Sequence, residues 1–364
     1  MRTVGLIVNP VAGMGGSVGL KGTDGAMFEE AVALGARPVS PLRVAEFFHH
    51  VERREALRLL VAPGVMGADH AKAAGIKHEV VGAIGDPPRA EDTRRLATAL
   101  IEAGAELLVF AGGDGTARDV ADAVGLRVPV VAIPSGVKVY SAVFCYTPQA
   151  AAELLEAFID GADTEEAEVL DIDEDAFRAG RVDARHYGYL LVPEVERLLQ
   201  GGKEASSGAS PEVRRELAAA VAEELVPGTL YLLGSGTTVR AVADALGVEK
   251  TLLGVDAVLD GKLVGADLNE QAILELLDRY ERAVVVVTPL GGNGFIFGRG
   301  NKQFTPEVLR RVGRDNIVVI ADRAKLMQLP ALHVDTGDSG LDEVLSGYID
   351  VVVGRGHSKM MRVM

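Results

Sequence analysis

The stretch FAGGDGTARD, residues 110–119, places three glycines around one acid, Asp114, directly after an apolar run. Glycine lets a phosphate approach the backbone closely, because no Cβ stands in the way. We expect a helix to start at Thr116 and to turn its positive end towards that phosphate. Asp114 would then lie beside the transferred group, where it could accept a proton from an attacking hydroxyl or help to hold Mg²⁺.

Short apolar runs alternate with helical segments over residues 1–160, as they do in parallel βαβ units. Their near-continuous hydrophobicity predicts strands that are buried on both faces. The predicted strands are Thr3–Val8, Leu57–Ala62, His78–Gly82, Glu106–Ala111 and Val128–Ile133. The clearest helix is Ala90–Ala103, with Leu96, Leu100 and Ile101 on one stripe. These features predict an α/β sandwich around a parallel sheet.

The pattern changes at about Glu165, where two alternating runs flank an Arg-Ala-Gly turn. A hairpin signal follows at Asp260–Gly261. Later strands are predicted at Ala283–Thr288, Asn316–Ile320, Ala331–Val334 and Ile349–Val353. We therefore expect a second domain over residues 161–364, mainly β and more antiparallel than the first. We also expect the active site in the cleft between the domains, and C-terminal strands that return to the first domain.

The composition excludes several classes of protein. A net charge of −15 and a pI near 5.0 argue against a nucleic-acid binder, which needs a basic face. No apolar stretch approaches the roughly 20 residues of a membrane span, and the N-terminus does not resemble a signal peptide, so we expect a cytoplasmic protein. The single cysteine, Cys145, excludes an internal disulfide framework and is expected in the core. We also expect a homo-oligomer, a dimer or a tetramer.

Four glycine-rich turns stand out: residues 9–16, 112–115, 133–136 and 234–238. In open α/β sheets, ligands collect at the carboxyl ends of strands, where helix N-termini favour anions. Several such turns indicate a polyanionic ligand, although each could also be only a tight strand-to-helix connection. The P-loop and dinucleotide fingerprints are both missing, so the phosphate loop is of another kind.

Three groups of binding residues are predicted from these turns. Those for the donor phosphates are Asn9, Gly13, Gly112, Gly113, Gly115, Thr116, Ser135, Gly136 and Lys138. Those for a nucleotide or substrate in the second domain are Gly234, Ser235, Gly236, Thr237 and Thr238. A polar turn beyond the first strand adds Lys21, Thr23 and Asp24 as substrate candidates. Lys138 and the residues of this turn could equally lie on the solvent-exposed surface without binding a ligand.

The run FAGGDGTARD resembles the G-G-D-G-T signature of the NAD kinase and diacylglycerol kinase superfamily. NPVAG, residues 9–13, is similar to the N-P-x-x-G turn of the lipid-kinase branch. GSGTTVRAVADALG, residues 234–247, resembles the T-G-S-T-A-Y turn and helix of the second domain of NAD kinases. TPLGGNGFIFGRGNKQFTPEVLRRVG, residues 288–313, is most similar to a prokaryotic ATP-NAD kinase or AcoX-like subgroup. The resemblance spans nearly the whole chain, in order.

This resemblance implies a two-domain phosphotransferase. ATP, or another donor, would lie with its phosphates over Gly112–Thr116, bridged by Mg²⁺, and Asp114 would meet the acceptor hydroxyl. The leading acceptor is the 2′-hydroxyl of NAD. One alternative is a kinase of a small polyol, a keto-alcohol or a lipid alcohol, although the chain lacks the basic amphipathic face that favours lipid. Another is a nucleotide-binding regulator without turnover.

The chain departs from NAD kinases where they carry an Asn-Glu/Asp pair for the dinucleotide. No Asn occurs between Asn9 and Asn269, and Asn269–Glu270 follows the second-domain turn, out of order. The N-x-G-x-L-G-F segment is replaced by PSGVKVY, residues 134–140. The carboxylates available in the interval are Asp171, Asp173, Asp175 and Glu194. We choose Asp173 for the ribose hydroxyls, because one carboxylate can accept bonds from both.

Other charged residues are assigned no catalytic role. Arg118 and Asp122, four apart, are expected to form an exposed helix ion pair, and Asp119 is expected to be a helix-surface acid rather than a Mg²⁺ ligand. The acidic run 171–175 lacks the Gly and the Glu that a calcium loop needs at its sixth and twelfth positions. No histidine lies in a zinc-binding H-E-x-x-H pattern, so all are taken as structural.

Overall fold

The computed structural model describes residues 1–16, 18, 26–136, 139–172, 184–195, 198–199, 211–251, 254–290, 293–299 and 301–364. Its contacts divide the chain into two compact units. The first comprises Met1–Met14 and Gly22–Gly202, and the second comprises Gly15–Lys21 and Lys203–Met364. The main division by contacts falls at residues 202 and 203, and the domain boundary at residues 160 and 161 stays a prediction.

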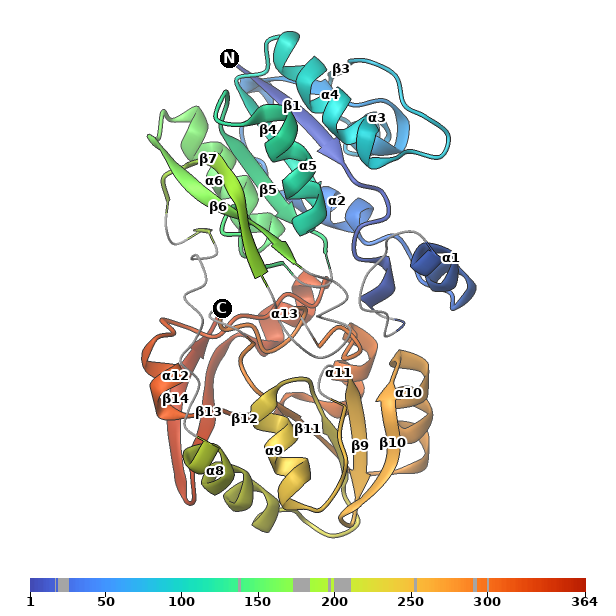
Figure 1. The fold of residues 1–364 in the computed structure, drawn as a ribbon, viewed down its shortest axis with the longest axis vertical. Coiled ribbons are helices and arrows are strands. Elements are labelled where there is room, and N and C mark those ends of the chain that lie inside the picture. Colours follow the sequence, from blue (N-terminus) through green and yellow to red (C-terminus); the bar gives the residue numbers. More distant parts are fainter. Residues whose placement is uncertain are drawn as a thin grey trace. The chain divides into compact units, whose positions relative to one another are not determined.

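A five-stranded parallel sheet forms the centre of the first unit, with strand order β3-β2-β1-β4-β5 (Figure 1). Its strands are β1 (Arg2–Val8), β2 (Leu57–Val61), β3 (His78–Val80), β4 (Leu107–Gly112) and β5 (Val130–Pro134). All five predicted strands are confirmed, with ends that differ by at most two residues. Every residue of β4 and β5 is buried, because helices cover both faces of the sheet.

The helices of the first unit cover the sheet in two layers. They are α1 (Ala26–Ala33), α2 (Ser40–His50), α3 (Ala68–Ala73), α4 (Ala90–Glu102), α5 (Asp114–Val124) and α6 (Pro148–Ile159), with the 3₁₀ turns η1 (Met14–Gly16), η2 (Arg54–Ala56) and η3 (Gly64–Met66). Helix α2 packs against α6, and α4 packs against α5. The predicted stripe of α4 is confirmed: Leu96 and Leu100 are fully buried, and Ile101 packs against the same core. The core position of Cys145 is also confirmed.

An antiparallel hairpin, β6 (Thr164–Ile172) and β7 (Ala184–Pro193), also belongs to the first unit. Strand β6 packs on α5, and β7 packs on both α5 and β5 (Figure 1). The alternating sequence correctly indicates two strands that each have one buried face. The sequence does not reveal that the hairpin packs on α5 and β5. Because of this packing, the division by contacts falls after the hairpin in the chain.

A seven-stranded sheet forms the second unit, with strand order β10-β9-β8-β11-β12-β13-β14 (Figure 1). The strands are β8 (Leu230–Leu233), β9 (Val255–Leu259), β10 (Lys262–Leu268), β11 (Ala283–Val287), β12 (Ile317–Ile320), β13 (Gly347–Gly354) and β14 (His357–Val363). The mainly β character is confirmed, but the central strands β8, β11, β12 and β13 are parallel, and the antiparallel pairings are those of β9 with β8 and β10 and of β13 with β14.

Two further predictions for the second unit have clear outcomes. The hairpin at Asp260–Gly261 is confirmed, and both residues adopt positive φ, as a type I′ turn requires. The strand expected at Ala331–Val334 is reduced to isolated bridges at Leu332 and His333. The C-terminal strands β13 and β14 pair within the second sheet, so they do not make the expected return to the first.

Helices cover both faces of the second sheet. They are α8 (Pro211–Glu223), α9 (Thr237–Ala245), α10 (Glu270–Arg279), α11 (Pro306–Val312), α12 (Arg323–Met327) and α13 (Ser339–Leu345), with the 3₁₀ turn η5 (Arg314–Asn316). Apolar residues of α8 and α9 share one core cluster with the sheet, and those of α10, α11 and α13 share another. Among the described residues, no helix combines the length and hydropathy needed to cross a bilayer.

Candidate functional site

In the first sheet, the strands that follow β1 in the chain are added first on one side of it and then, from β4 onward, on the other side. From β1 the chain moves outward through β2 and β3 on one side, whereas β4 and β5 occupy the other. Ligands of open parallel sheets bind at such a point, outside the carboxyl ends of the strands. The turn at residues 9–13 follows β1, and the turn at residues 112–116 follows β4. Two of the predicted turns therefore flank the switch point.

The turn after β5 packs against both of these turns. Ser135 N and Gly136 N donate hydrogen bonds to Gly112 O, at 2.8 and 3.1 Å. Gly13 has a φ of +81°, and a Cβ at this position would lie 1.8 Å from Ser135 O. A Cβ on Gly113 would lie 3.3 Å from Gly136 Cα. The glycines thus allow three backbone turns to meet in a space that side chains would fill.

Asn9 connects the first turn to the start of α5. Its Nδ2 donates to Thr116 Oγ1 at 3.0 Å, and its Oδ1 accepts a hydrogen bond from Val11 N at 3.2 Å. Its backbone N donates to Ala111 O at 2.9 Å. In this structure Asn9 and Thr116 shape the turns, and their direct contact with phosphate stays a prediction.

Helix α5 begins at Asp114, two residues before the expected start at Thr116. Gly113 is its N-cap in an extended conformation, and Ala117 N closes the first turn by donating to Gly113 O at 3.0 Å. The N–H groups in the first turn of a helix have no partner within that helix. Those of Gly115 and Thr116 therefore lie at the carboxyl end of β4, and, apart from the neighbouring residues and backbone of its own helix, no described heavy atom lies within 4 Å of a Cβ built on Gly115.

The Asp114 carboxylate is held by the segment that follows the β5 turn. Its Oδ1 accepts from Ser141 N at 2.8 Å, from Ser141 Oγ at 2.6 Å and from Tyr140 N at 3.1 Å. Its Oδ2 accepts from Tyr140 N at 2.9 Å. Only an ionised carboxylate is purely an acceptor, so this set of donors matches the charged form. The geometry fixes one oriented negative charge at the switch point.

Ser141 is a residue that the sequence reasoning missed. It is fully buried, and its Oγ accepts a hydrogen bond from Leu170 N in β6 at 3.0 Å. The hydroxyl therefore links the β6 backbone to Asp114. Its neighbour Tyr140 has a pKa raised to about 12 by burial and by the Asp114 charge, so the phenol stays neutral at physiological pH. A polar residue inside the apolar run VYSAVF was the available signal.

Ser135 offers a hydroxyl to the same site. It is 1% exposed, and its Oγ has no hydrogen-bond partner in the described part of the chain. A buried polar group without a partner costs about 1–3 kcal/mol. At the carboxyl end of β5, this hydroxyl is a donor that a bound phosphate would satisfy.

Several predicted site residues lie outside the described residues. They are Lys21, Thr23, Asp24, Lys138 and Asp173, together with Asp175. Asp171 lies in β6, but its side chain is not described. Glu194 is exposed and follows the last residue of β7. Their roles stay predictions.

Two acidic residues of α5, Asp119 and Asp122, have partners within the first unit. Asp119 is buried, unlike the expected surface acid, and its Oδ1 pairs with Arg94 Nη1 at 2.5 Å. Asp122 accepts a hydrogen bond from Tyr187 Oη at 2.6 Å, and the Arg118 guanidinium lies 5.9 Å from the centre of the same ring. Within the described ranges, no group of three or more His, Cys, Asp or Glu side chains could hold a metal ion.

The predicted turn of the second unit lies between β8 and α9. Gly236, with a φ of +117°, is the N-cap of α9. Ser235 N and Oγ both donate to Asn301 Oδ1, at 2.8 and 2.9 Å, and Asn301 Nδ2 donates to Ile296 O at 3.0 Å. The GRGNKQF run therefore fixes the turn through Asn301, a residue that the sequence reasoning did not single out.

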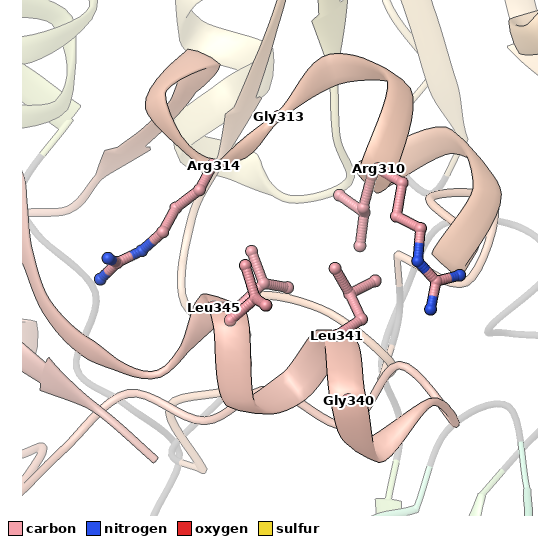
Figure 2. A pocket seen from close by; sticks show the side chains of 8 residues that line it. Arg310, Gly313, Arg314, Gly340, Leu341 and Leu345 are labelled. Carbon is pink, nitrogen blue, oxygen red and sulfur yellow. The ribbon is translucent and has the colours of Figure 1, made fainter.

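Two cavities of the second unit lie away from these turns. One, of about 240 Å³, lies between α11 and α13. Figure 2 shows Leu341 and Leu345 pointing into it, while Arg310 and Arg314 extend outward. Arg310 pairs with Asp338, and Arg314 donates to Tyr348 O at 3.0 Å, so the cavity offers mainly apolar surface. The other, of about 520 Å³, lies at the amino ends of β8 and β11.

Comparison with known families gives two matches, one in each unit. The model of the ATP-NAD kinase N-terminal domain matches residues 4–162, and that of the ATP-NAD kinase C-terminal domain matches residues 227–363. No curated protein matches the chain in sequence. Among solved structures, the UDP-GlcNAc 2-epimerase from Methanocaldococcus jannaschii aligns over 95% of this chain and 81% of its own, with 9% identity. Its TM-score of 0.25 carries no argument about fold or function.

Proposed function

The chain belongs to the ATP-NAD kinase family, and from that premise we propose that it transfers the terminal phosphate of ATP to the 2′-hydroxyl of NAD. The observation that carries the proposal is the Asp114 carboxylate, held by Tyr140 and Ser141 at the switch point of a parallel sheet. Phosphoryl transfer leaves little covalent work to side chains, so a fixed charge beside a phosphate-binding turn is the main requirement.

The donor phosphates are proposed to bind over Gly112–Thr116. The first-turn N–H groups of α5 and the Ser135 hydroxyl are the donors available to them. Mg²⁺, when bound, would neutralise charge on the donor phosphates. Gly13 and Gly113 keep the backbone close enough for these contacts.

Asp114 is proposed to act on the acceptor hydroxyl. Its hydrogen-bond donors hold the carboxylate in one orientation, from which it would align the hydroxyl and accept its proton as the phosphate is transferred. Positioning of this kind supplies much of the barrier reduction in a reaction between two bound substrates.

The acceptor is proposed to use the turn Gly234–Thr238 of the second unit, with Asp173 on the ribose hydroxyls. Lys138 would meet a donor phosphate, and the turn containing Lys21 and Asp24 would meet substrate. ATP and NAD are both cytoplasmic metabolites, and we propose that location for the enzyme, as a homo-oligomer.

A second candidate function keeps the same chemistry with another acceptor, a small hydroxylated metabolite or a lipid alcohol. The missing Asn-Glu/Asp pair favours it, because no asparagine lies between Asn9 and Asn269 to contact a dinucleotide. The third candidate is a regulator that binds nucleotide without turnover. Such a function would not explain why the Asp114 carboxylate is held in one orientation.

A substrate panel separates these candidates. Purified protein is incubated with ATP and Mg²⁺ together with NAD, NADH or a series of small alcohols, and ADP release and product mass are recorded. Formation of NADP by the wild type, and not by Asp114→Asn, supports the proposal. Turnover of ATP with an alcohol and no NADP contradicts NAD as the acceptor but supports the kinase. ATP binding without any product supports the regulator.

A further inference from the structure

We infer that Lys302 is a phosphate-binding residue, whose ammonium group binds the phosphate chain of ATP next to the turn that follows β1. The inference rests on the proposed donor, ATP, but not on the identity of the acceptor. It names a cation for the proposed phosphate site.

The turns proposed for the donor phosphates need a positive charge. Residues 9–13, 112–116 and 133–136 contain no lysine or arginine, and the Asp114 carboxylate adds a negative charge. Mg²⁺ offsets only part of the charge of a triphosphate, and enzymes that transfer phosphate commonly place a lysine on the phosphates as well. A compact ammonium on a flexible stem suits this task. A lysine close to one of these turns is therefore a candidate.

Lys302 lies against the segment that continues the first of these turns. A Cβ built on Gly16, the last residue of η1, would lie 2.5 Å from Lys302 Cδ and 3.3 Å from Lys302 Cβ. Gly16 is buried, and both residues belong to the second unit, whose first segment is Gly15–Lys21. The methylene stem of Lys302 therefore packs on the Gly16 backbone, where a side chain would displace it.

The covalent chain keeps this contact close to the phosphate turn. Gly16 follows Gly13 by three residues, and three residues span at most about 11 Å. In the same turn, Asn9 Nδ2 donates to Thr116 Oγ1 in the first turn of α5 at 3.0 Å. The lysine stem is thus held near the end of a turn that the proposed donor uses, and its ammonium can reach a phosphate chain that extends from there.

The backbone of Lys302 is fixed by its neighbours. Phe304 N donates to Asn301 O at 3.1 Å, which closes a turn over residues 301–304. Asn301 Nδ2 also donates to Ile296 O at 3.0 Å. Asn301, Gln303 and Phe304 are buried, whereas Lys302 is half-buried. Because its backbone is already ordered, Lys302 loses less conformational freedom when it binds a phosphate.

Nucleotide binding by matched variants tests the inference in the full-length protein. Lys302→Met keeps the length of the side chain and removes its charge, so calorimetry should find the Kd for ATP raised by about 10- to 100-fold, as expected for loss of a hydrogen bond to a charged group. The Kd for adenosine, which has no phosphate, should not change. Lys302→Arg keeps the charge and should retain most of the ATP affinity. Lys262→Met, at an exposed position of β10, is the control for loss of one charge and should bind ATP as the wild type does.

Gly16→Ala tests the contact itself. The φ of Gly16 lies outside the left-handed region, so alanine is tolerated by the backbone, but its methyl group would displace the Lys302 stem. The substitution should raise the Kd for ATP several-fold in the wild-type background. It should have little further effect in Lys302→Met, because the charge that it displaces is already gone.

The outcomes separate this inference from the proposed function. Unchanged ATP affinity in Lys302→Met, or equal losses for ATP and adenosine, overturns the inference even if the wild type forms NADP. Weaker ATP binding by Lys302→Met, with no NADP formed by the wild type, supports the inference and contradicts NAD as the acceptor. A wild-type protein that does not bind ATP overturns both.

Discussion

Both units place a glycine turn at the carboxyl end of a parallel strand, but they differ in the group that lies there. In the first unit, Asp114 is held by donors from Tyr140 and Ser141. In the second, the turn after β8 is held by Asn301, whose Oδ1 accepts hydrogen bonds from Ser235 N and Ser235 Oγ. The sheet topology therefore selects the place for a ligand, and the loops decide its chemistry. A carboxylate suits a reacting hydroxyl, whereas a neutral amide only fixes the backbone of the turn.

The largest effect is expected from Asp114→Asn. The amide cannot take a proton, so kcat should fall by about 10² to 10⁴-fold. It also turns an N–H group towards the donors of Tyr140 and Ser141, so the 139–141 segment should shift. Steady-state kinetics measures the loss, and calorimetry should find ATP affinity within a few-fold of wild type. A variant that retains more than a third of the wild-type kcat would show that Asp114 is not the base.

Acid should destabilise the second unit through His333. Burial and the Arg299 charge lower the pKa of His333 to about 4, so the unfolded state binds more protons than the folded state between pH 6.5 and 4. The free energy of unfolding should therefore fall as pH drops through this window, by about 2 kcal/mol between pH 7 and pH 5. Urea unfolding at both pH values measures this, and His333→Gln should lose most of the difference. An unchanged pH dependence in the variant would exclude His333 as the cause.

Ser141→Ala should lower kcat by about tenfold, because it removes a hydrogen bond to a charged group and leaves Leu170 N without its acceptor. A merely structural defect would not move the pH dependence of the rate. Loss of a donor to the ionised carboxylate should shift the acid limb of the kcat profile to higher pH. An unshifted acid limb would mean that Ser141 only supports the loop.

Gly113→Ala should weaken ATP binding by several-fold with a modest loss of stability. Gly113 has a φ of −121°, which alanine adopts without strain, but its Cβ would lie 3.3 Å from Gly136 Cα. The methyl group would therefore press on the backbone of the β5 turn and also obstruct the phosphate. Gly13→Ala is the contrasting variant: its φ of +81° and a 1.8 Å approach to Ser135 O should destabilise the first unit. Equal ATP affinity in Gly113→Ala and wild type would place the donor elsewhere.

The smallest effect is expected from Asp119→Asn. Because Asp119 pairs with Arg94, the Mg²⁺ concentration that gives half-maximal rate should not change. A several-fold increase in that concentration would make Asp119 a metal ligand.

The parts that could be predicted from the sequence are local. The glycines of residues 112–115 and the apolar runs of β4 and β5 sufficed for the first sheet and for the position of Asp114. The contact between Ser141 and Asp114 depends on the path of the chain after β5, which no local pattern encodes. Asn301 is a single residue in a loop, and only the folded chain brings its side chain to Ser235 in the turn after β8.

The sequence does contain a signal for the parallel strands at the centre of the second sheet. The run AVVVV of β11 is continuously apolar, as a strand covered on both faces requires, whereas an antiparallel strand with one wet face alternates. The exposed edge strand β10 shows the opposite pattern, with no fully buried residue. These two hydrophobicity patterns distinguish central strands from edge strands more clearly than the hairpin signal at Asp260–Gly261 does.

The bond from Leu170 N to Ser141 Oγ has a consequence for recombining this chain with its relatives. A chimera joined near residue 160 would take β6 and β7 from the other parent, and with them the backbone donor that orients Ser141. A crossover beyond the hairpin keeps that donor with its carboxylate. Junctions after β7 should therefore leave kcat nearly unchanged, whereas junctions before β6 should lower it, even where both chimeras fold.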